Sequence, residues 1–160
     1  MGLFNKKKKK IILMDIDGVL SPLSRVDEPY SLIKVPWATF AIPDYTLDYL
    51  KTNLMKLRGF TWSSSWENSS NAINKYLGVP NSPFIHFPDD MEETLWFKDK
   101  YLVDFCLKNC KQEILIVDDS IPKVSKLRSI SNVTLIIPDP LYGLSEDDFN
   151  RITSWLSDAY

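Results

Sequence analysis

An apolar run near the N-terminus leads directly into two aspartates and a glycine. The run is Lys10–Met14, and Asp15, Asp17 and Gly18 follow it closely. A short, continuously apolar segment that ends in a turn signal is typical of a buried strand in a parallel sheet. Ligands bind at the carboxyl ends of such strands, where two carboxylates can share a divalent cation and one can attack an electrophile. The pattern predicts an α/β fold with a site at the end of this strand.

Length and composition fit one domain. The chain has 160 residues, of which 44% are hydrophobic and 25% charged, values that are ordinary for a globular protein large enough to bury a core. No segment approaches the ~20 consecutive apolar residues of a membrane span. The first residues become charged too soon for a secretory signal. We therefore expect a cytoplasmic protein without a transmembrane segment.

The basic residues are unevenly distributed. Lys6 and Lys10 bound a run of five lysines, and the remaining 14 basic residues are opposed by 21 acidic ones. We interpret residues 1–10 as a basic tail on an acidic domain that spans residues 11–160. A lysine run of this kind can make weak contact with an anionic surface, either nucleic acid or lipid.

Strand and helix patterns alternate along the domain. This alternation predicts a Rossmann-like three-layer α/β/α sandwich with a mostly parallel central sheet. Strands are expected at 10–14, 60–62, 114–117 and 133–137, and helices at 44–57, 66–77, 98–109, 123–130 and after Ser145. Residues 21–43 contain four prolines and a β-leaning segment at 30–42, which we interpret as a flap or hairpin.

Cap signals mark the ends of several helices. Asp44 is the expected N-cap of the first helix, and Gly78 ends the second. Ser145 and Asp148 have the spacing of a capping box for the last helix. Cys106 and Cys110 fall on one face of the helix at 98–109, where we interpret them as free thiols.

Polar side chains follow three of the predicted strands, and a lysine begins a helix between the second and third. Phosphoryl transfer through an aspartyl intermediate uses these parts. It needs a nucleophilic carboxylate, a second carboxylate that shuttles a proton, a hydroxyl that binds phosphate, and a lysine with a hard cation to neutralise charge. The candidates, in chain order, are Asp15 and Asp17, then Ser63 or Ser64, then Lys98 or Lys100, then Asp118 and Asp119.

This ordered set resembles the haloacid dehalogenase (HAD) superfamily of phosphohydrolases. Residues 15–20, with the sequence DIDGVL, match its first motif. The resemblance implies that Asp15 is the nucleophile and that Asp17 is the acid and base, with its backbone carbonyl on the metal. It also implies Mg²⁺ as the cofactor. The metal residues would then be Asp15, Asp17, Asp118 and Asp119, and the phosphate-binding residues Gly18, Ser64, Ser65 and Lys98.

A narrower resemblance covers residues 11–156. The sequence Trp-Ser-Ser-Ser-Trp at 62–66, Asn71 and the segment 77–80 are similar to a small capless HAD group, which includes domains fused in bacterial RNA-repair proteins. In that group the hydroxyl lies two residues before the second tryptophan, which selects Ser64 over Ser63. We interpret Trp62 and Trp66 themselves as packing residues.

A flap in place of a cap domain implies an open site. Such a site suits an exposed phosphate on a large substrate such as a nucleic-acid end, although an acidic domain does not favour tight binding to a duplex. The alternatives are a phosphatase of small metabolites or phosphoproteins, and a non-catalytic HAD-like binding module. A signalling receiver uses the same residue types, but in receivers the adjacent acidic pair comes first in the chain. Here the adjacent pair, Asp118 and Asp119, comes last, and this order disfavours a receiver. The sequence leaves the oligomeric state open.

Overall fold

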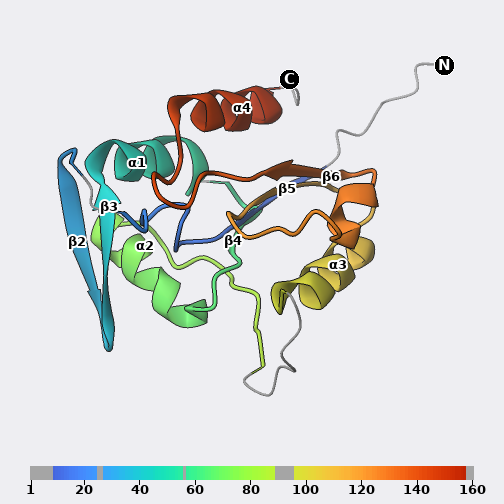
Figure 1. The fold of residues 1–160 in the computed structure, drawn as a ribbon, viewed down its shortest axis with the longest axis horizontal. Coiled ribbons are helices and arrows are strands. Elements are labelled where there is room, and N and C mark those ends of the chain that lie inside the picture. The colour runs from blue at the N-terminus through green and yellow to red at the C-terminus, as the bar shows by residue number, and fades with distance from the viewer. Residues whose placement is uncertain (1–8, 25–26, 56, 89–95, 158–160) are drawn as a thin grey trace.

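The computed structural model describes residues 9–24, 27–55, 57–88 and 96–157. At its centre four parallel strands form a sheet in the order β4-β1-β5-β6 (Figure 1). Met14 pairs with Trp62 on one side and with Val117 on the other, so three strands end level with one another. The predicted parallel sheet is confirmed, and its first strand is buried between two neighbours, as expected. The strands are β1 (Lys10–Met14), β4 (Phe60–Trp62), β5 (Glu113–Val117) and β6 (Val133–Ile136).

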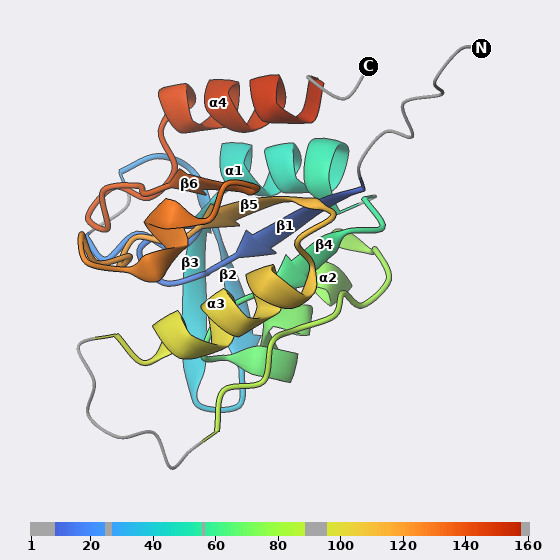
Figure 2. The same ribbon diagram turned by 90° about the vertical axis from the view of Figure 1, so that its right-hand side faces the viewer.

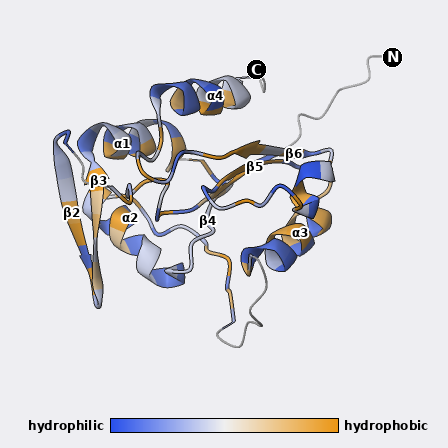
Figure 3. Cartoon of the chain, viewed as in Figure 1, coloured by the Kyte–Doolittle hydropathy of each residue, from blue (hydrophilic) through white to orange (hydrophobic). Residues whose placement is uncertain are grey.

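Helices cover both faces of this sheet (Figure 2). On one face lie α1 (Asp44–Tyr49) and α4 (Glu146–Ser157), and on the other lies α3 (Lys98–Lys108). Side chains alternate between the faces along a strand. Ile12 and Met14 therefore pack with α1 and α4, whereas Ile11 and Leu13 pack with α3. Figure 3 shows the hydrophobic residues along β5 and β6, and polar and apolar residues interspersed along α4.

The insertion at 21–43 contains an antiparallel hairpin of β2 (Tyr30–Val35) and β3 (Ala38–Pro43). It stands at one side of the sheet, beside α2 (Asn71–Leu77) (Figure 1). Ile33, Phe40 and Ile42 are buried in the same apolar cluster as α1. The segment that we expected to be a flap or hairpin is thus a hairpin that is packed into the core.

One expected N-cap and one expected helix start are wrong. Asp44 is not an N-cap: Pro43 occupies that position without a side-chain cap. The Asp44 carboxylate instead accepts a hydrogen bond of 2.7 Å from the Ser31 hydroxyl of β2. The helix expected from residue 66 begins as a 3₁₀ turn at Glu67–Ser70, because Glu67 has a left-handed φ of 47°. The α-helical part then starts at Asn71.

The helices expected at 44–57 and at 123–130 are shorter than expected. The predicted caps at Gly78 and Ser145 are confirmed. After α1 the chain forms one π-helical turn, Leu50–Leu54, and the segment 123–130 forms only a 3₁₀ turn, Lys126–Ser129. Gly78 closes α2 with φ 67°. Ser145 Oγ accepts from the Asp148 N–H at 3.2 Å, and the Ser145 N–H donates to Asp148 Oδ2 at 3.0 Å.

The last lysine of the basic run belongs to the sheet. Lys10 is the first residue of β1, and its ammonium donates to the carbonyl oxygens of Trp155 and Leu156 at the end of α4. The same ammonium lies 3.8 Å from Glu113 Oε2 and 4.5 Å from the centre of the Trp155 ring. The strand expected at 10–14 is therefore confirmed from its first residue. Residues 6–8 lie outside the described residues.

None of the helices within the described residues is both long and apolar enough to cross a membrane.

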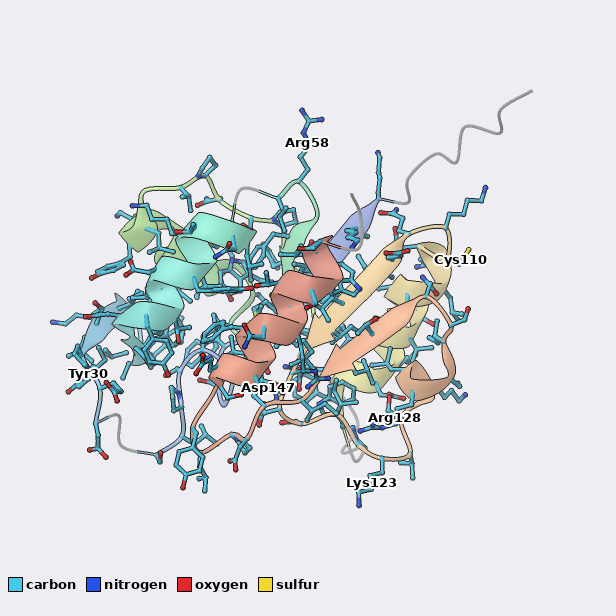
Figure 4. All side chains as sticks on the ribbon, turned by 90° about the horizontal axis from the view of Figure 1, so that it is seen from above. Tyr30, Arg58, Cys110, Lys123, Arg128 and Asp147 are labelled. Carbon is cyan, nitrogen blue, oxygen red and sulfur yellow. The ribbon has the colours of Figure 1, made fainter. Side chains whose placement is uncertain are left out.

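The two cysteines differ in environment, and we expect them to differ in reactivity. Cys106 is buried under the sheet, where burial raises its pKa to about 12. Cys110 is exposed at the rim of the molecule (Figure 4). At pH 8 only about one Cys106 in 10⁴ would be a thiolate, which is the reactive form. A maleimide at pH 8 should label one thiol in the folded protein and two after denaturation, and the folded Cys110→Ser variant should stay unlabelled. Rapid labelling of that variant would contradict the burial of Cys106.

Candidate active site

The ends of β1 and β5 and the start of α3 bring an ammonium between two carboxylates. Lys98 Nζ lies 2.5 Å from Asp15 Oδ2 and 2.7 Å from Asp118 Oδ2. All three residues are buried, with exposed fractions of 4% for Lys98, 6% for Asp15 and 0% for Asp118. Charges are almost never buried unless they are paired, and here one cation serves two anions.

Backbone amides fix the orientation of both carboxylates. Asp15 Oδ1 accepts from the N–H of Ile16 at 2.8 Å, and Asp118 Oδ1 accepts from the N–H of Ser120 at 2.9 Å. The backbone N–H of Asp15 is bonded to the carbonyl of Val117, which ties the end of β1 to the end of β5. Each carboxylate thus uses one oxygen for its own loop and the other for Lys98.

A third carboxylate completes a cluster that fits a divalent cation. Oxygen atoms of Asp15, Asp118 and Asp119 all lie within 4.8 Å of one another. With Lys98, three carboxylates and one ammonium leave two negative charges. Carboxylate oxygens are ligands that Mg²⁺ and Ca²⁺ both accept, so the donor set fits such an ion without selecting Mg²⁺. The Asp17 side chain is not part of this cluster, and the metal contact expected from its carbonyl stays a prediction.

The pKa values of the cluster reflect burial first, and then the charges of its members. Burial raises the pKa of Asp118 to about 6, although the Lys98 charge opposes the rise. Burial also raises the pKa of Asp119. For Lys98, burial alone would lower the pKa, but the charges of Asp15 and Asp118 outweigh it and raise the pKa. A bound dication would stabilise the ionised carboxylates, so metal binding and proton binding should compete here.

The glycine after the acid pair is required by close packing. Gly18 has φ 70°, and a Cβ at this position would lie 2.7 Å from the Asp119 carboxylate. Any larger residue would therefore displace a member of the carboxylate cluster. The Gly18 N–H is bonded to the carbonyl of Ser21 at 2.9 Å. Its contribution to phosphate binding stays a prediction.

A cavity of about 240 Å³ gives access to this cluster. It brings together five of the residues singled out from the sequence: Asp15, Asp17, Ser65, Lys98 and Asp119. Its other lining residues are Leu23, Trp96, Phe97 and Ser120, which sequence reasoning missed because no motif marks them. Lys100 is exposed and lines a different cavity of about 310 Å³, so Lys98 is the lysine that reaches the carboxylates.

The serines after β4 occupy unequal positions. Ser63 and Ser64 are completely buried, and their hydroxyls have no hydrogen-bond partner. Ser65 is exposed and lines the cavity. A buried hydroxyl without a partner is costly, which is why such groups mark sites where a ligand or a movement supplies one. The role predicted for Ser64 stays a prediction, and Ser65 is the serine in place to touch a ligand.

Asp17 is held by a residue that the sequence analysis treated as packing. The indole N–H of Trp66 donates to Asp17 Oδ2 at 2.7 Å. Although the Asp17 side chain is open to the cavity, partial burial raises its pKa, and the hydrogen bond from Trp66 opposes that rise. A raised pKa keeps a carboxylic acid protonated closer to neutral pH, as a general acid requires.

No protein-family model and no curated protein matches the chain.

Proposed function

We propose that the chain is a Mg²⁺-dependent phosphomonoester hydrolase of the HAD type, which works through an aspartyl-phosphate intermediate. The observation that carries this proposal is the buried Lys98 between Asp15 and Asp118, with Asp119 completing a carboxylate cluster at the floor of a cavity. A buried cluster with two excess negative charges lowers the stability of the fold, so a structural role does not explain it. Such a cluster suits a site that binds a cation and a phosphate.

In the first step a carboxylate oxygen of Asp15 attacks phosphorus, and the bond from phosphorus to the leaving oxygen breaks. Asp17 gives its proton to that oxygen. Mg²⁺ bound by Asp15, Asp118 and Asp119 would neutralise charge on the phosphoryl oxygens. Lys98 holds Asp15 in place and adds positive charge beside the phosphoryl group.

In the second step Asp17, now ionised, takes a proton from water. The water oxygen bonds to phosphorus, the acyl phosphate bond to Asp15 breaks, and inorganic phosphate leaves. Asp15 is regenerated as a carboxylate and Asp17 as an acid, so the cycle is balanced. The Ser64 hydroxyl is the one we expect to hydrogen-bond a phosphoryl oxygen, and Ser65, which lines the cavity, is the alternative.

An open cavity suits a phosphate that projects from a large molecule. The β2–β3 hairpin is buried in the core through Ile33, Phe40 and Ile42, rather than forming a separate cap. We therefore propose a nucleic-acid end as the substrate class, with small metabolites and phosphoproteins as the alternatives.

The direct test is hydrolysis of p-nitrophenyl phosphate by the purified chain. We expect turnover with millimolar MgCl₂, its loss with excess EDTA, and its return when MgCl₂ exceeds the chelator. Mg²⁺ binding by calorimetry without any turnover would instead favour a binding module. In the same assay, a 3′-phosphorylated oligonucleotide should exceed a sugar phosphate and a phosphopeptide in kcat/KM, and a clear preference for the sugar phosphate would reject the nucleic-acid proposal.

The buried serine hydroxyls allow a prediction that separates stability from activity. Ser64→Ala and Ser70→Ala both remove a buried hydroxyl that has no partner, so each should raise the free energy of unfolding by about 1 kcal/mol in urea denaturation. Ser64→Ala should also lower kcat/KM about tenfold, the value of one hydrogen bond to phosphate.

Ser70→Ala is the matched control, because Ser70 lies in the 3₁₀ turn and is not among the cavity residues. Should only Ser65→Ala lower kcat/KM, the phosphate-binding hydroxyl is that of Ser65 and the assignment of Ser64 is wrong.

A further inference from the structure

The indole of Trp66 is held by two contacts, its hydrogen bond to Asp17 and a ring contact on its other side. On the far side its ring contacts Phe40 of β3 edge to face, with ring centres 5.1 Å apart and an interplanar angle of 80°. Phe40 is buried at 1% exposure, so this contact ties Trp66 to the hairpin core. Such aromatic pairs add stability and geometric preference beyond the area that they bury.

The backbone after Trp66 is fixed as well. Glu67 adopts a left-handed φ of 47°, which a residue with a Cβ takes at an energetic cost. Its N–H is bonded to the carbonyl of Ser64, and its carboxylate accepts from the N–H of Phe87 at 2.6 Å and lies 2.9 Å from His86 Nδ1. These contacts hold the strained turn, and the turn directs the Trp66 side chain toward Asp17.

Asp17 needs such a constraint. Its side chain is exposed to the cavity, and Asp17 is only two residues from Asp15. Without the hydrogen bond from Trp66, the Asp17 carboxylate would be free to rotate toward the carboxylate cluster. In the structure its Oδ2 is bonded to Trp66 instead, and the cluster consists of Asp15, Asp118 and Asp119.

We propose that Trp66 is a positioning residue, whose indole N–H holds the Asp17 carboxylate at the cavity wall and away from the carboxylate cluster, so that Asp17 donates its proton to the leaving group. This inference rests on the proposed function and deepens it. The β2–β3 hairpin takes part through Phe40, which supports the indole from behind.

Leaving groups of different basicity test this role. Proton donation matters greatly for an alkoxide leaving group and little for p-nitrophenolate, which leaves readily without a proton. Trp66→Phe keeps a ring against Phe40 but removes the N–H. We expect kcat/KM with an alkyl phosphate to fall on the order of tenfold or more, and kcat/KM with p-nitrophenyl phosphate to fall less than about threefold. This ratio reports formation of the acyl phosphate alone, whereas kcat also contains its hydrolysis, in which Asp17 acts on water with either substrate.

Trp62→Phe is the matched control. Trp62 is fully buried and donates its own indole N–H to Asn74 Oδ1 at 2.9 Å, with no contact to Asp17. Its replacement should lower the denaturation midpoint and change kcat/KM by the same factor with both substrates. Combining Trp66→Phe with Asp17→Asn should cost no more with the alkyl phosphate than Asp17→Asn alone, because both changes remove one function.

A second readout needs neither metal nor turnover. The shifts in urea midpoint caused by Trp66→Phe and Asp17→Ala should be non-additive in the metal-free protein, because the two side chains share one hydrogen bond. Equal losses of kcat/KM with both substrates in Trp66→Phe, or additive midpoint shifts, would overturn the positioning role while leaving a phosphatase. If the unmodified chain hydrolyses neither substrate, the proposed function fails and this inference fails with it.

Discussion

Replacing Asp15 with asparagine should abolish phosphate-ester hydrolysis, with kcat lowered by a factor on the order of 10³ or more. An amide cannot form the acyl phosphate, so the whole two-step route is lost. The shape of the side chain is retained, and Asn can still accept the 2.8 Å hydrogen bond from Ile16. Its NH₂ group would face Lys98, which keeps Asp118 as its partner at 2.7 Å. Steady-state hydrolysis of p-nitrophenyl phosphate is the measurement.

The fold of this variant should survive, because the substitution removes one of the excess negative charges in the cluster. Thermal unfolding in EDTA should therefore show a midpoint equal to or above that of the unmodified chain. Asp147→Asn is the matched control, since Asp147 is exposed on α4 and should leave kcat unchanged (Figure 4). Full activity of Asp15→Asn would exclude Asp15 as the nucleophile and the aspartyl-phosphate route with it.

The second large effect is expected at Lys98, and here stability is the main quantity. Lys98→Met leaves Asp15 and Asp118 buried without their common cation. Removing one partner of a buried ion pair costs about 3–5 kcal/mol, so the free energy of unfolding should fall by that amount near pH 7.5. Urea denaturation measures it, and hydrolysis should be lost as well, because the nucleophile is no longer held or neutralised.

The pH dependence of this loss follows from Asp118. Burial already raises its pKa to about 6, and the absence of the Lys98 charge should raise that pKa further. A carboxylate whose pKa is raised by folding favours the folded state where it is protonated, and this stabilisation is lost as the pH rises through the folded-state pKa. The deficit of Lys98→Met should therefore be largest above that pKa and shrink toward pH 5. Millimolar Mg²⁺ should also reduce it at pH 7.5, since a cation replaces part of the missing charge.

Lys100 provides the control on the same helix. It is exposed, and no described residue forms an ion pair with it, so Lys100→Met should change the free energy of unfolding by no more than about 0.5 kcal/mol. Equal stability of Lys98→Met and Lys100→Met would contradict the buried ion pairs of Lys98 with Asp15 and Asp118.

The sheet and the convergence of the site were predictable because they depend on patterns along single segments. The apolar run of β1 marks a buried strand, and parallel strands bring their carboxyl ends to one edge. Asp15 and Asp118 had to meet once both strands were placed. The register that aligns Met14 with Val117 then brings their loops within reach of one lysine.

Features that depend on partners distant in the chain were not predictable. Asp44 has the residue type of an N-cap, but the Ser31 hydroxyl of a hairpin strand engages its carboxylate. Trp66 has the composition of a packing residue, and only the folded loops place its N–H on Asp17. The left-handed Glu67 is compensated by residues about 20 positions away, so no local propensity indicates where the helix starts. Sequence periodicity indicates which residues of a segment are buried. It does not indicate which side chains from distant parts of the chain will contact them.

The hydrogen bonds between Lys10 and the end of α4 have a practical consequence for immobilising the protein. They join the start of the first strand to the last described helix, 145 residues apart, at the amino edge of the sheet. The carboxylates lie at the opposite edge, one strand length away, which for five residues is about 16 Å. An affinity tag or a surface linker attached beyond either end of the domain would therefore leave the cavity facing away from the point of attachment. Immobilised protein should bind even bulky phosphorylated molecules without hindrance from its anchor.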